Sequence, residues 1–355
     1  MIKRQPTLQD VAAEACVSPQ TVTRVLNNPT LVSERTRLKV LGAMNRLNYV
    51  PNRSAQALAG KLTPTLGMVS TSLAFHATSQ IASFVKKYAA KRGYQVVITM
   101  FEEWNHLVLQ AALNEFRAQR INRIVLCLPI ERYDAEKLVA DNPDMLCIFL
   151  DVPPTAKVSY VGFHYCDGTV RSVNHLLELG HRKFGLLTGP EISISARLRL
   201  ACWRETLCQA NIIDMDSEYG DWSARSGWIK AIHLFARNPD ITAILVANDQ
   251  MALGVMSALR KMKKRIPQDV SVIGYDDTLD SQYFYPALTT VAQNFDLLGK
   301  RVVHHMLAME DQEKKSITEL LPTTLVIRES TASPVETTYP SSLVEQLKIL
   351  IEQYT

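Results

Sequence analysis

Residues 7–27 read TLQDVAAEACVSPQTVTRVLN, and this stretch holds the start signals of two short helices. Thr7 and Asp10 have the spacing of a capping box, and apolar residues follow at helical intervals over about 8–15. After a two-residue connection, Ser18 can cap a second helix whose first residue would be a proline, which is favoured there. The stretch therefore predicts two helices joined by a tight turn, the core of a helix-turn-helix motif.

The second helix of this motif would have one apolar and one polar face. Val22, Val25 and Leu26 would face inward, and the outward face would carry glutamine, threonine, arginine and asparagine. Glutamine and arginine present paired hydrogen-bonding groups that suit adenine and guanine edges, so we expect this helix to enter a major groove. The residues that we expect at the DNA, in the head and in the segment after it, are Thr7, Pro19, Gln20, Thr21, Arg24, Asn27, Ser33, Asn52, Arg53, Gln56 and Leu58.

Positive charge is concentrated in the first part of the chain. Residues 1–61 contain nine lysine and arginine residues against three acidic residues, a net charge of +6, whereas the whole chain carries +4. Residues 62–355 therefore carry −2. This separation indicates a basic head that meets a polyanion and a nearly neutral body with another task.

A third helix is expected to complete an all-α DNA-binding domain over 1–51. Ser33 can cap it, and the leucine and methionine residues at 38, 41, 44 and 47 are expected to pack inward before the helix ends near Asn48. The alternative is a generic three-helix bundle with a solvated basic face. The charge and the groove-facing residue types disfavour that alternative.

Residues 52–61 are expected to form a hinge helix or linker. They are good helix formers, but a helix this short is marginal alone, so we expect it to order only on DNA beside the same segment of a second subunit. Leu58 is the one large apolar residue there, and its insertion between minor-groove base steps would kink the duplex. Packing of Leu58 against the head or the body is an equally compatible reading.

The composition predicts a globular, cytoplasmic protein of two or three domains. The 355 residues are 47% hydrophobic, yet no apolar run is long enough to cross a bilayer and no apolar leader follows the first basic residues. The six cysteines contain no C-x-x-C pair, so they are interpreted as ordinary thiols rather than a zinc site or a disulfide framework. We expect no metal and no cofactor.

Apolar, β-branched runs alternate with amphipathic stretches through the body. The runs are 65–71, 94–100, 122–128, 145–150, 160–163, 183–189, 242–249 and 270–276. This alternation is typical of parallel α/β sheets, and the number of strands predicts two doubly wound lobes. Ligands of such sheets bind beyond the carboxyl ends of strands, where this chain has Asp151, Asn248, Asp249, Asp276 and Asp277. Helix capping explains Asp249 and Asp277 equally well.

Two further segments suggest a sugar or another neutral polyol as the ligand. Arginine occurs at 197 and 199, and Trp222 lies in the sequence GDWS. A guanidinium group can donate to neighbouring hydroxyls, and an indole can stack on the apolar face of a pyranose. One of the two arginines could equally be only a salt-bridge partner.

Seven ungapped segments resemble the LacI family of bacterial repressors. They are TLQDVA (7–12), VSPQTVTRV (17–25), LNYVPNR (47–53), SARLRL (195–200), GDWS (220–223), LVANDQMALG (245–254) and GYDDT (274–278). The resemblance implies a homodimer whose heads bind a palindromic operator in double-stranded DNA. It also implies a core like that of periplasmic sugar-binding proteins, in which the ligand lies between two lobes joined by three chain crossings.

The resemblance also implies particular ligand-binding residues and boundaries. Arg199, Asn248 and Asp276 would bind hydroxyl groups, and Asp151 would be a further polar residue in the cleft. The apolar walls would be formed by Phe75, Ala77, Ile81, Phe163, Trp222 and Phe295. Ser195 and Gln293 would lie nearby. The core would cover 62–330, with one lobe of about 62–162 and 293–322 and another of about 163–292 and 323–330.

The sequence departs from the family pattern at four of these places. Cys127 stands at a cleft position held by asparagine in a well-known member, and Thr78 replaces a cleft proline. Pro19 replaces a base-contacting tyrosine. Cys16 occupies a turn position usually held by glycine, which would cost stability if that residue needs a positive φ.

The C-terminal tail has the pattern of an oligomerisation helix. After a linker at 331–342, Leu343, Leu347 and Leu350 recur at heptad spacing within 343–355, and this resembles a tetramerising helix of the family. A lone amphipathic tail packed on the core is the alternative.

The sequence thus predicts a non-enzymatic, sugar-inducible repressor released from its operator by a galactoside. A regulator of the same family that responds to another sugar or to a co-repressor is the nearest alternative. A transport module is opposed by the basic head. A sugar-processing enzyme with Asp276 and Asp277 as paired carboxylates is opposed because adjacent residues at a strand end tend to point apart.

Overall fold

The structure is a computed structural model, and it describes residues 4, 6–50, 64–101, 103–309 and 316–335. The chain divides into two compact units, residues 1–64 and residues 65–355. The expected hinge at 52–61 and the expected helix at 343–355 lie outside the described residues.

The first unit contains the helix-turn-helix that the sequence predicts. Its elements are α1 (Leu8–Ala15), α2 (Pro19–Asn27), the short 3-10 helix η1 (Pro29–Leu31) and α3 (Glu34–Leu47). The capping box is confirmed, because the Thr7 hydroxyl accepts from the Asp10 N–H while the Asp10 carboxylate accepts from the Thr7 N–H. Ser18 caps α2 by a single bond, in which its hydroxyl accepts from the Thr21 N–H.

The inward face of α3 differs from the sequence prediction. Leu38 and Leu41 are 58% and 41% exposed, so the prediction that they pack inward was wrong. Val40 and Ala43 are fully buried instead, with Met44 half-buried beside them, because the stripe that meets α1 and α2 follows the 3-4 spacing of these residues. The turn between α1 and α2 does need a left-handed residue, since Cys16 has φ +52°, at a cost of about 1 kcal/mol relative to glycine.

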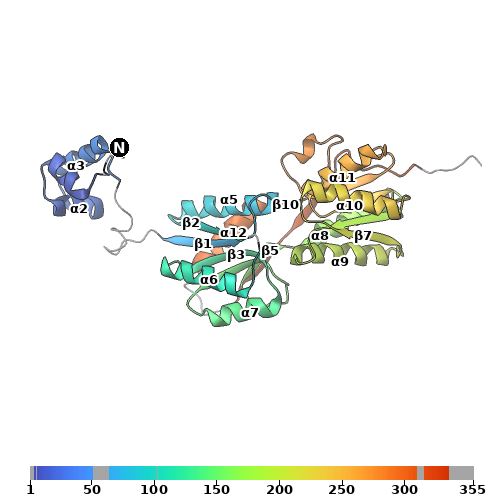
Figure 1. Ribbon diagram of the computed structural model, residues 1–355, viewed down its shortest axis with the longest axis horizontal. Coiled ribbons are helices and arrows are strands. Elements are labelled where there is room, and N and C mark those ends of the chain that lie inside the picture. Colours follow the sequence, from blue (N-terminus) through green and yellow to red (C-terminus); the bar gives the residue numbers. More distant parts are fainter. Residues whose placement is uncertain (1–3, 5, 51–63, 102, 310–315, 336–355) are drawn as a thin grey trace, which may run out of the picture. The chain divides into compact units, whose positions relative to one another are not determined.

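One lobe of the second unit has a six-stranded parallel sheet in the order β11-β5-β4-β3-β1-β2. Helices α5 and α12 cover one face of this sheet, and α6 and α7 cover the other (Figure 1). Its elements are β1 (Thr65–Ser70), α5 (His76–Lys91), β2 (Gln95–Met100), α6 (His106–Ala118), β3 (Arg123–Pro129), α7 (Arg132–Asp141), β4 (Leu146–Asp151), β5 (Tyr160–Phe163), α12 (Phe295–Ala308) and β11 (Thr318–Leu321).

The other lobe has the strand order β12-β10-β9-β8-β6-β7, in which only β12 is antiparallel to its neighbour. Helices α8 and α9 lie on one face, and α10 and α11 lie on the other (Figure 1). Its elements are α8 (Tyr165–Glu178), β6 (Phe184–Thr188), α9 (Ile194–Gln209), β7 (Met215–Tyr219), α10 (Ala224–Arg237), β8 (Ala243–Val246), α11 (Asp249–Lys261), β9 (Ser271–Asp276), the 3-10 helix η2 (Ser281–Tyr283), β10 (Thr289–Gln293) and β12 (Thr323–Val326).

The chain passes between the two lobes three times. It leaves the first lobe after β5, returns between β10 and α12, and crosses again between β11 and β12. All eight strands expected from the apolar runs are present, whereas β7, β10, β11 and β12 were not anticipated. The four strands that the sequence did not predict are short or polar. One of them, β7, reads MDSEY and is an edge strand, where charged residues are typical.

The expectation of six free thiols was wrong for one pair. Cys166 in α8 and Cys202 in α9 form a disulfide, with their Cα atoms 5.6 Å apart. The sequence separation of 36 hid this pairing, because only the packing of α8 against α9 brings the two residues together.

Gly254→Ala is expected to destabilise the core by about 2–3 kcal/mol. A Cβ atom at Gly254 in α11 would lie 1.9 Å from the Ala224 carbonyl oxygen of α10, so the two helices would have to move apart. Urea unfolding of the full chain measures the effect. Ser257→Ala, on the exposed side of the same helix, should change the free energy of unfolding by less than about 0.5 kcal/mol, and equal effects of the two variants would contradict the close helix contact.

Candidate ligand-binding cavity and nucleic-acid interface

A cavity of about 290 Å³ lies in the second unit and is lined by residues of both lobes. All twelve residues that the sequence assigned to the ligand site line it: Phe75, Ala77, Ile81, Asp151, Phe163, Ser195, Arg199, Trp222, Asn248, Asp276, Gln293 and Phe295. Its volume is at the scale of a small organic ligand.

Arg199 is the buried cation of this cavity. It extends from α9, is 5% exposed and donates to the Ala247 carbonyl oxygen. Its guanidinium carbon lies 3.7 Å from the ring centre of Tyr275, with the Tyr165 and Trp222 rings at 5.3 and 5.8 Å. Its Nε atom has no hydrogen-bond partner among the described residues. The aromatic rings therefore hold the planar guanidinium group of Arg199, and the protein does not use all of its hydrogen-bond donors.

Asp276 supplies the opposite charge at the end of β9. It is 4% exposed and accepts a 2.6 Å hydrogen bond from the Gln293 amide. Burial raises the pKa of Asp276 to about 6, although the Arg199 guanidinium pulls it downward. Its φ is +111° and that of Asp277 is +56°, so two successive residues hold conformations that are uncommon outside glycine. This strained end of β9 turns the Asp276 carboxylate into the cavity and separates it from its neighbour.

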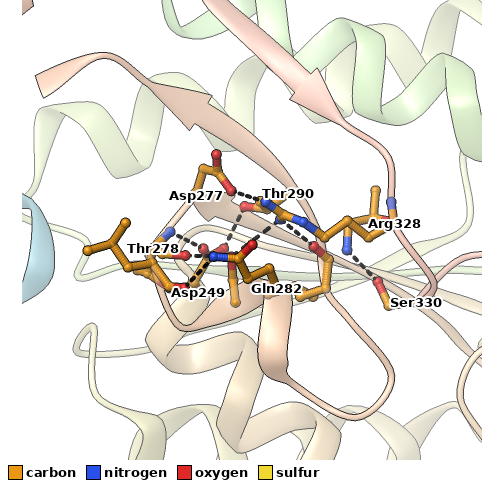
Figure 2. A network of polar contacts seen from close by, with 11 residues as sticks. Asp249, Asp277, Thr278, Gln282, Thr290, Arg328 and Ser330 are labelled. Carbon is orange, nitrogen blue, oxygen red and sulfur yellow. Dashed lines mark hydrogen bonds and ion pairs between the residues drawn. The ribbon is translucent and has the colours of Figure 1, made fainter.

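Asp277 belongs to a different group of residues. Its carboxylate pairs with Arg328 at 2.6 Å (Figure 2). Arg328 also donates to the Ser281 hydroxyl. Asp277 does not line this cavity, whereas Asp276 does. The interpretation of Asp277 as a helix cap is wrong, since the 3-10 helix that follows begins at Ser281 without a side-chain cap.

Asn248, rather than Asp249, caps α11. Its side-chain oxygen accepts from the Met251 N–H, and its amide donates to the Trp222 carbonyl oxygen. Asp249 instead points into the lobe, where its carboxylate accepts from the Thr278 N–H at 2.8 Å and the Thr290 hydroxyl at 2.6 Å (Figure 2). Burial and the nearby Asp276 charge raise the pKa of Asp249 to about 7. Asp249 therefore supports the loop after β9 and does not line the cavity.

Aromatic and aliphatic side chains form the opposite wall. Phe163 and Phe295 meet edge to face with ring centres 5.6 Å apart, and Ile81 of α5 packs in the same apolar cluster. Trp222, with φ +74°, closes another side. Gly189 is required beside it, because a Cβ atom there would lie 2.2 Å from the indole ring.

Cys127 adds a neutral thiol to the apolar wall. It lies within the buried part of β3, is 9% exposed and packs with the cluster that contains Ile81. Burial raises the pKa of the Cys127 thiol to about 12, so it carries no charge near neutral pH. The cavity therefore offers little hydrogen bonding at this position.

Asp151 is shared between the two lobes. It ends β4 of the first lobe, and its carboxylate accepts from the Ser195 N–H at 2.8 Å and the Ser193 hydroxyl at 3.3 Å in the second lobe. Burial raises the pKa of Asp151, and the hydrogen bonds from these serines oppose that rise. A second bond between the lobes runs from the His76 N–H to the Gln250 side-chain oxygen at 3.1 Å. Any change in lobe arrangement must break or replace these contacts.

Several cavity residues were not predicted from the sequence, among them Tyr165, Pro190, Ile192, Ser193 and Asp221. They come from loops and first helical turns whose positions depend on lobe packing. Ser193 had a local signal, because it caps α9 through the Ala196 N–H. Arg197 turns away from the cavity and pairs with Glu131, so the two arginines of SARLRL have separate roles.

The candidate nucleic-acid interface is the outward face of α2. Pro19, Gln20 and Arg24 are exposed there, whereas Thr21 and Asn27 are half-buried. Thr7 and Ser33 both cap helices, which places their backbone at helix N-termini. The other predicted contacts, Asn52, Arg53, Gln56 and Leu58, lie outside the described residues.

Among the described residues, no group of three or more histidine, cysteine, aspartate or glutamate side chains is arranged to hold a metal ion. In the same part of the chain, no helix is both long and apolar enough to span a membrane.

Comparisons with known proteins identify a matching family for each of the two units. Residues 7–52 match the family described as bacterial regulatory proteins, lacI family, and residues 173–331 match a periplasmic binding protein-like domain. The lactose operon repressor of Klebsiella pneumoniae is 51% identical over 353 residues, covering 99% of this chain and 100% of that protein. The lactose operon repressor of Escherichia coli (strain K12) is 42% identical, covering 98% of this chain and 97% of that protein.

A solved structure gives the same result. The crystal structure of the lac repressor dimer bound to operator and the anti-inducer ONPF superposes with a TM-score of 0.85 at 42% identity, covering 93% of this chain and all of that one. A helix-turn-helix head and a two-lobed core around a cavity with polar and apolar walls define a ligand-responsive DNA-binding regulator. The chain belongs to the LacI family of bacterial regulatory proteins. It is a transcriptional repressor similar to lactose operon repressors, in a family that is not enzymatic.

Proposed function

We propose that this repressor binds a palindromic operator in the cytoplasm and is released from it by a galactoside. The observation that carries the sugar half of the proposal is the cavity, which places Arg199, Asn248, Asp276 and Gln293 opposite an aromatic and aliphatic wall. A pyranose needs this combination, because its hydroxyl edge requires donors and acceptors while its C–H face packs on apolar surface.

The charged pair would recognise neighbouring hydroxyl groups. Arg199 can donate to hydroxyl oxygens, and the Asp276 carboxylate can accept from hydroxyl groups while Gln293 holds it in place. Trp222, Phe163 and Phe295 would cover the apolar face of the sugar. The Asp151 carboxylate already accepts hydrogen bonds from Ser193 and Ser195. A sugar hydroxyl that donates to Asp151 would therefore add to these hydrogen bonds between the lobes or displace one of them.

The response follows from linkage between two arrangements of the lobes. A ligand that binds the low-DNA-affinity arrangement more tightly shifts the population away from the operator-bound one. The shift cannot exceed the ligand's differential affinity for the two arrangements. The contacts that Asp151 and Gln250 make across the lobes are the bonds that such a rearrangement would alter.

The DNA half of the proposal uses the predicted contact residues. Gln20 and Arg24 would read base edges, Thr21 and Asn27 would support them, and Thr7 and Ser33 would place helix N-termini at phosphates. We further propose that residues 52–61 form the hinge, with Asn52, Arg53, Gln56 and Leu58 at the minor groove.

The nearest alternative is a regulator whose ligand is another sugar or a co-repressor. Calorimetric titration with methyl β-D-galactoside and methyl β-D-glucoside separates the sugars, which differ at a single carbon centre. Binding of the galactoside alone supports the proposal, and binding of neither sugar refutes the sugar assignment. The sign of the ligand's effect on operator affinity separates inducer from co-repressor.

We propose that the active unit is a homodimer and that two dimers associate through residues 343–355. The second unit carries exposed apolar side chains that suit a self-association surface: Trp228, Leu253, Leu279, Tyr283 and Tyr285 are 38%, 45%, 77%, 80% and 84% exposed. Leu343, Leu347 and Leu350 would then form the seam of the second interface.

Leu347→Arg is expected to convert a tetramer into a dimer, because a charge at a central heptad position opposes helix association. Sedimentation equilibrium of the full chain measures the mass of the assembly. Glu345→Gln, between two of the heptad leucines, is the control and should leave the mass unchanged. A native protein that is already dimeric would contradict the tail assignment.

A further inference from the structure

Cys166 and Cys202 link the two helices that supply Tyr165 and Arg199 to the cavity. The disulfide joins the first turn of α8 to α9, with the Cα atoms 5.6 Å apart. Tyr165 precedes Cys166 directly, and Arg199 lies three residues before Cys202, close to one helical turn. The Arg199 guanidinium lies 5.3 Å from the Tyr165 ring centre, so the covalent link runs beside this contact.

The same end of α8 adjoins the crossings between the lobes. A single residue, His164, separates α8 from β5, the last strand of the first lobe before the chain crosses. Near this point, the Gly168 N–H donates to the Thr323 hydroxyl at 2.8 Å, and that hydroxyl donates to the His164 carbonyl oxygen at 3.2 Å. Thr323 follows the third crossing, so the link ties the crossing region to the helix that carries Arg199.

The two sulfur positions differ in accessibility. Cys166 is half-buried in the first turn of a 14-residue helix. Cys202 is 7% exposed. An external reagent would therefore reach Cys166 first, and Cys202 would act as the resolving thiol.

We propose that Cys166 and Cys202 form a thiol–disulfide exchange site at which the redox state sets the affinity of the cavity for its sugar. The oxidant is a low-molecular-weight disulfide, RSSR. The Cys166 thiolate attacks one of its sulfurs, forming a mixed disulfide and releasing RS⁻. The Cys202 thiolate then attacks the Cys166 sulfur, forming the protein disulfide and releasing the second RS⁻. The two protons of the cysteine thiols end on two RSH molecules, so the protein is oxidised and RSSR is reduced.

The oxidised state binds the sugar more tightly. The disulfide fixes the separation of α8 and α9, and so keeps Tyr165 against Arg199 before the ligand arrives. Preorganisation lowers the cost of ordering these side chains on binding. Reduction lets the two helices move independently and raises the Kd roughly threefold to tenfold. The affinity part of this inference rests on the proposed sugar binding.

The test begins with the redox state of the full chain. The protein is equilibrated with mixtures of reduced and oxidised glutathione, its free thiols are alkylated, and intact mass and peptide mapping locate the disulfide. The expected result is a link between Cys166 and Cys202 that forms in oxidising mixtures and is lost in reducing ones. A pair that stays as thiols in every mixture would overturn the proposal.

The second readout is the Kd for methyl β-D-galactoside, measured by calorimetry on oxidised and reduced protein. Cys166→Ser should bind with the affinity of the reduced native chain under both conditions. Cys208→Ser removes an exposed free thiol of the same helix and should retain the native redox response. A link that changes the melting temperature but leaves the Kd unchanged is only structural and would refute the affinity claim. Absence of galactoside binding in both states would refute the sugar assignment, whereas the mass measurements decide the redox chemistry independently.

Discussion

Arg199→Ala is expected to weaken galactoside binding by about 100-fold or more while leaving operator binding intact. Each charged hydrogen bond contributes about 1.5–3 kcal/mol, so the loss of two of them amounts to at least about 3 kcal/mol. Removal of the guanidinium also leaves the buried Asp276 without the cation that lowers its pKa. The variant should therefore behave as a repressor that no longer responds to the sugar.

Calorimetry with methyl β-D-galactoside measures the affinity, and fluorescence anisotropy with labelled operator measures DNA binding. Arg204→Ala is the matched control, because Arg204 lies on the same helix but is exposed and donates to the Ser217 hydroxyl outside the cavity. Its galactoside Kd should stay within about threefold of the native value. Retention of native affinity by Arg199→Ala would show that the cavity is not the sugar site.

Arg24→Ala is expected to weaken operator binding by about tenfold to 100-fold without changing sugar affinity. Arg24 is exposed on the outward face of α2, and a bidentate contact between arginine and guanine is worth about 1–3 kcal/mol of discrimination. Loss of a base contact should weaken binding to the operator much more than binding to a scrambled duplex.

The operator for this measurement is selected from random duplexes by the native protein. A scrambled duplex of the same composition is the reference, and the ratio of the two Kd values reports specificity. An equal loss on both duplexes, with a shallower salt dependence, would instead assign Arg24 to a phosphate contact.

Local signals explain why the head was predicted well from the sequence. The caps at Thr7, Ser18 and Ser33 each depend on residues within three positions, and all three occur as expected. The inward face of α3 was mispredicted because leucines at 38 and 41 fit an apolar periodicity, whereas packing against α1 and α2 selects Val40 and Ala43. Hydrophobicity alone does not say which of two overlapping stripes meets the rest of the domain.

The prediction of the cavity residues depended on a different kind of information. Strand ends marked Asp151, Asn248 and Asp276 as polar candidates, but convergence of residues from both lobes came only from the family resemblance. The sequence pattern favoured Asp249 as the helix cap, because an acidic residue at a helix N-terminus is favourable, whereas Asn248 caps α11. The disulfide and the position of Tyr165 follow from helix packing across a separation of 36 residues, for which the sequence has no local signal.

The most direct test of the central claim is the affinity of the native full chain for its selected operator as methyl β-D-galactoside is added. The proposed linkage predicts that the operator Kd rises at least about tenfold at saturating galactoside, whereas methyl β-D-glucoside has little effect at the same concentration. An operator Kd that falls with galactoside would make the ligand a co-repressor. An operator Kd that does not change would contradict the account that the cavity controls the DNA-binding head.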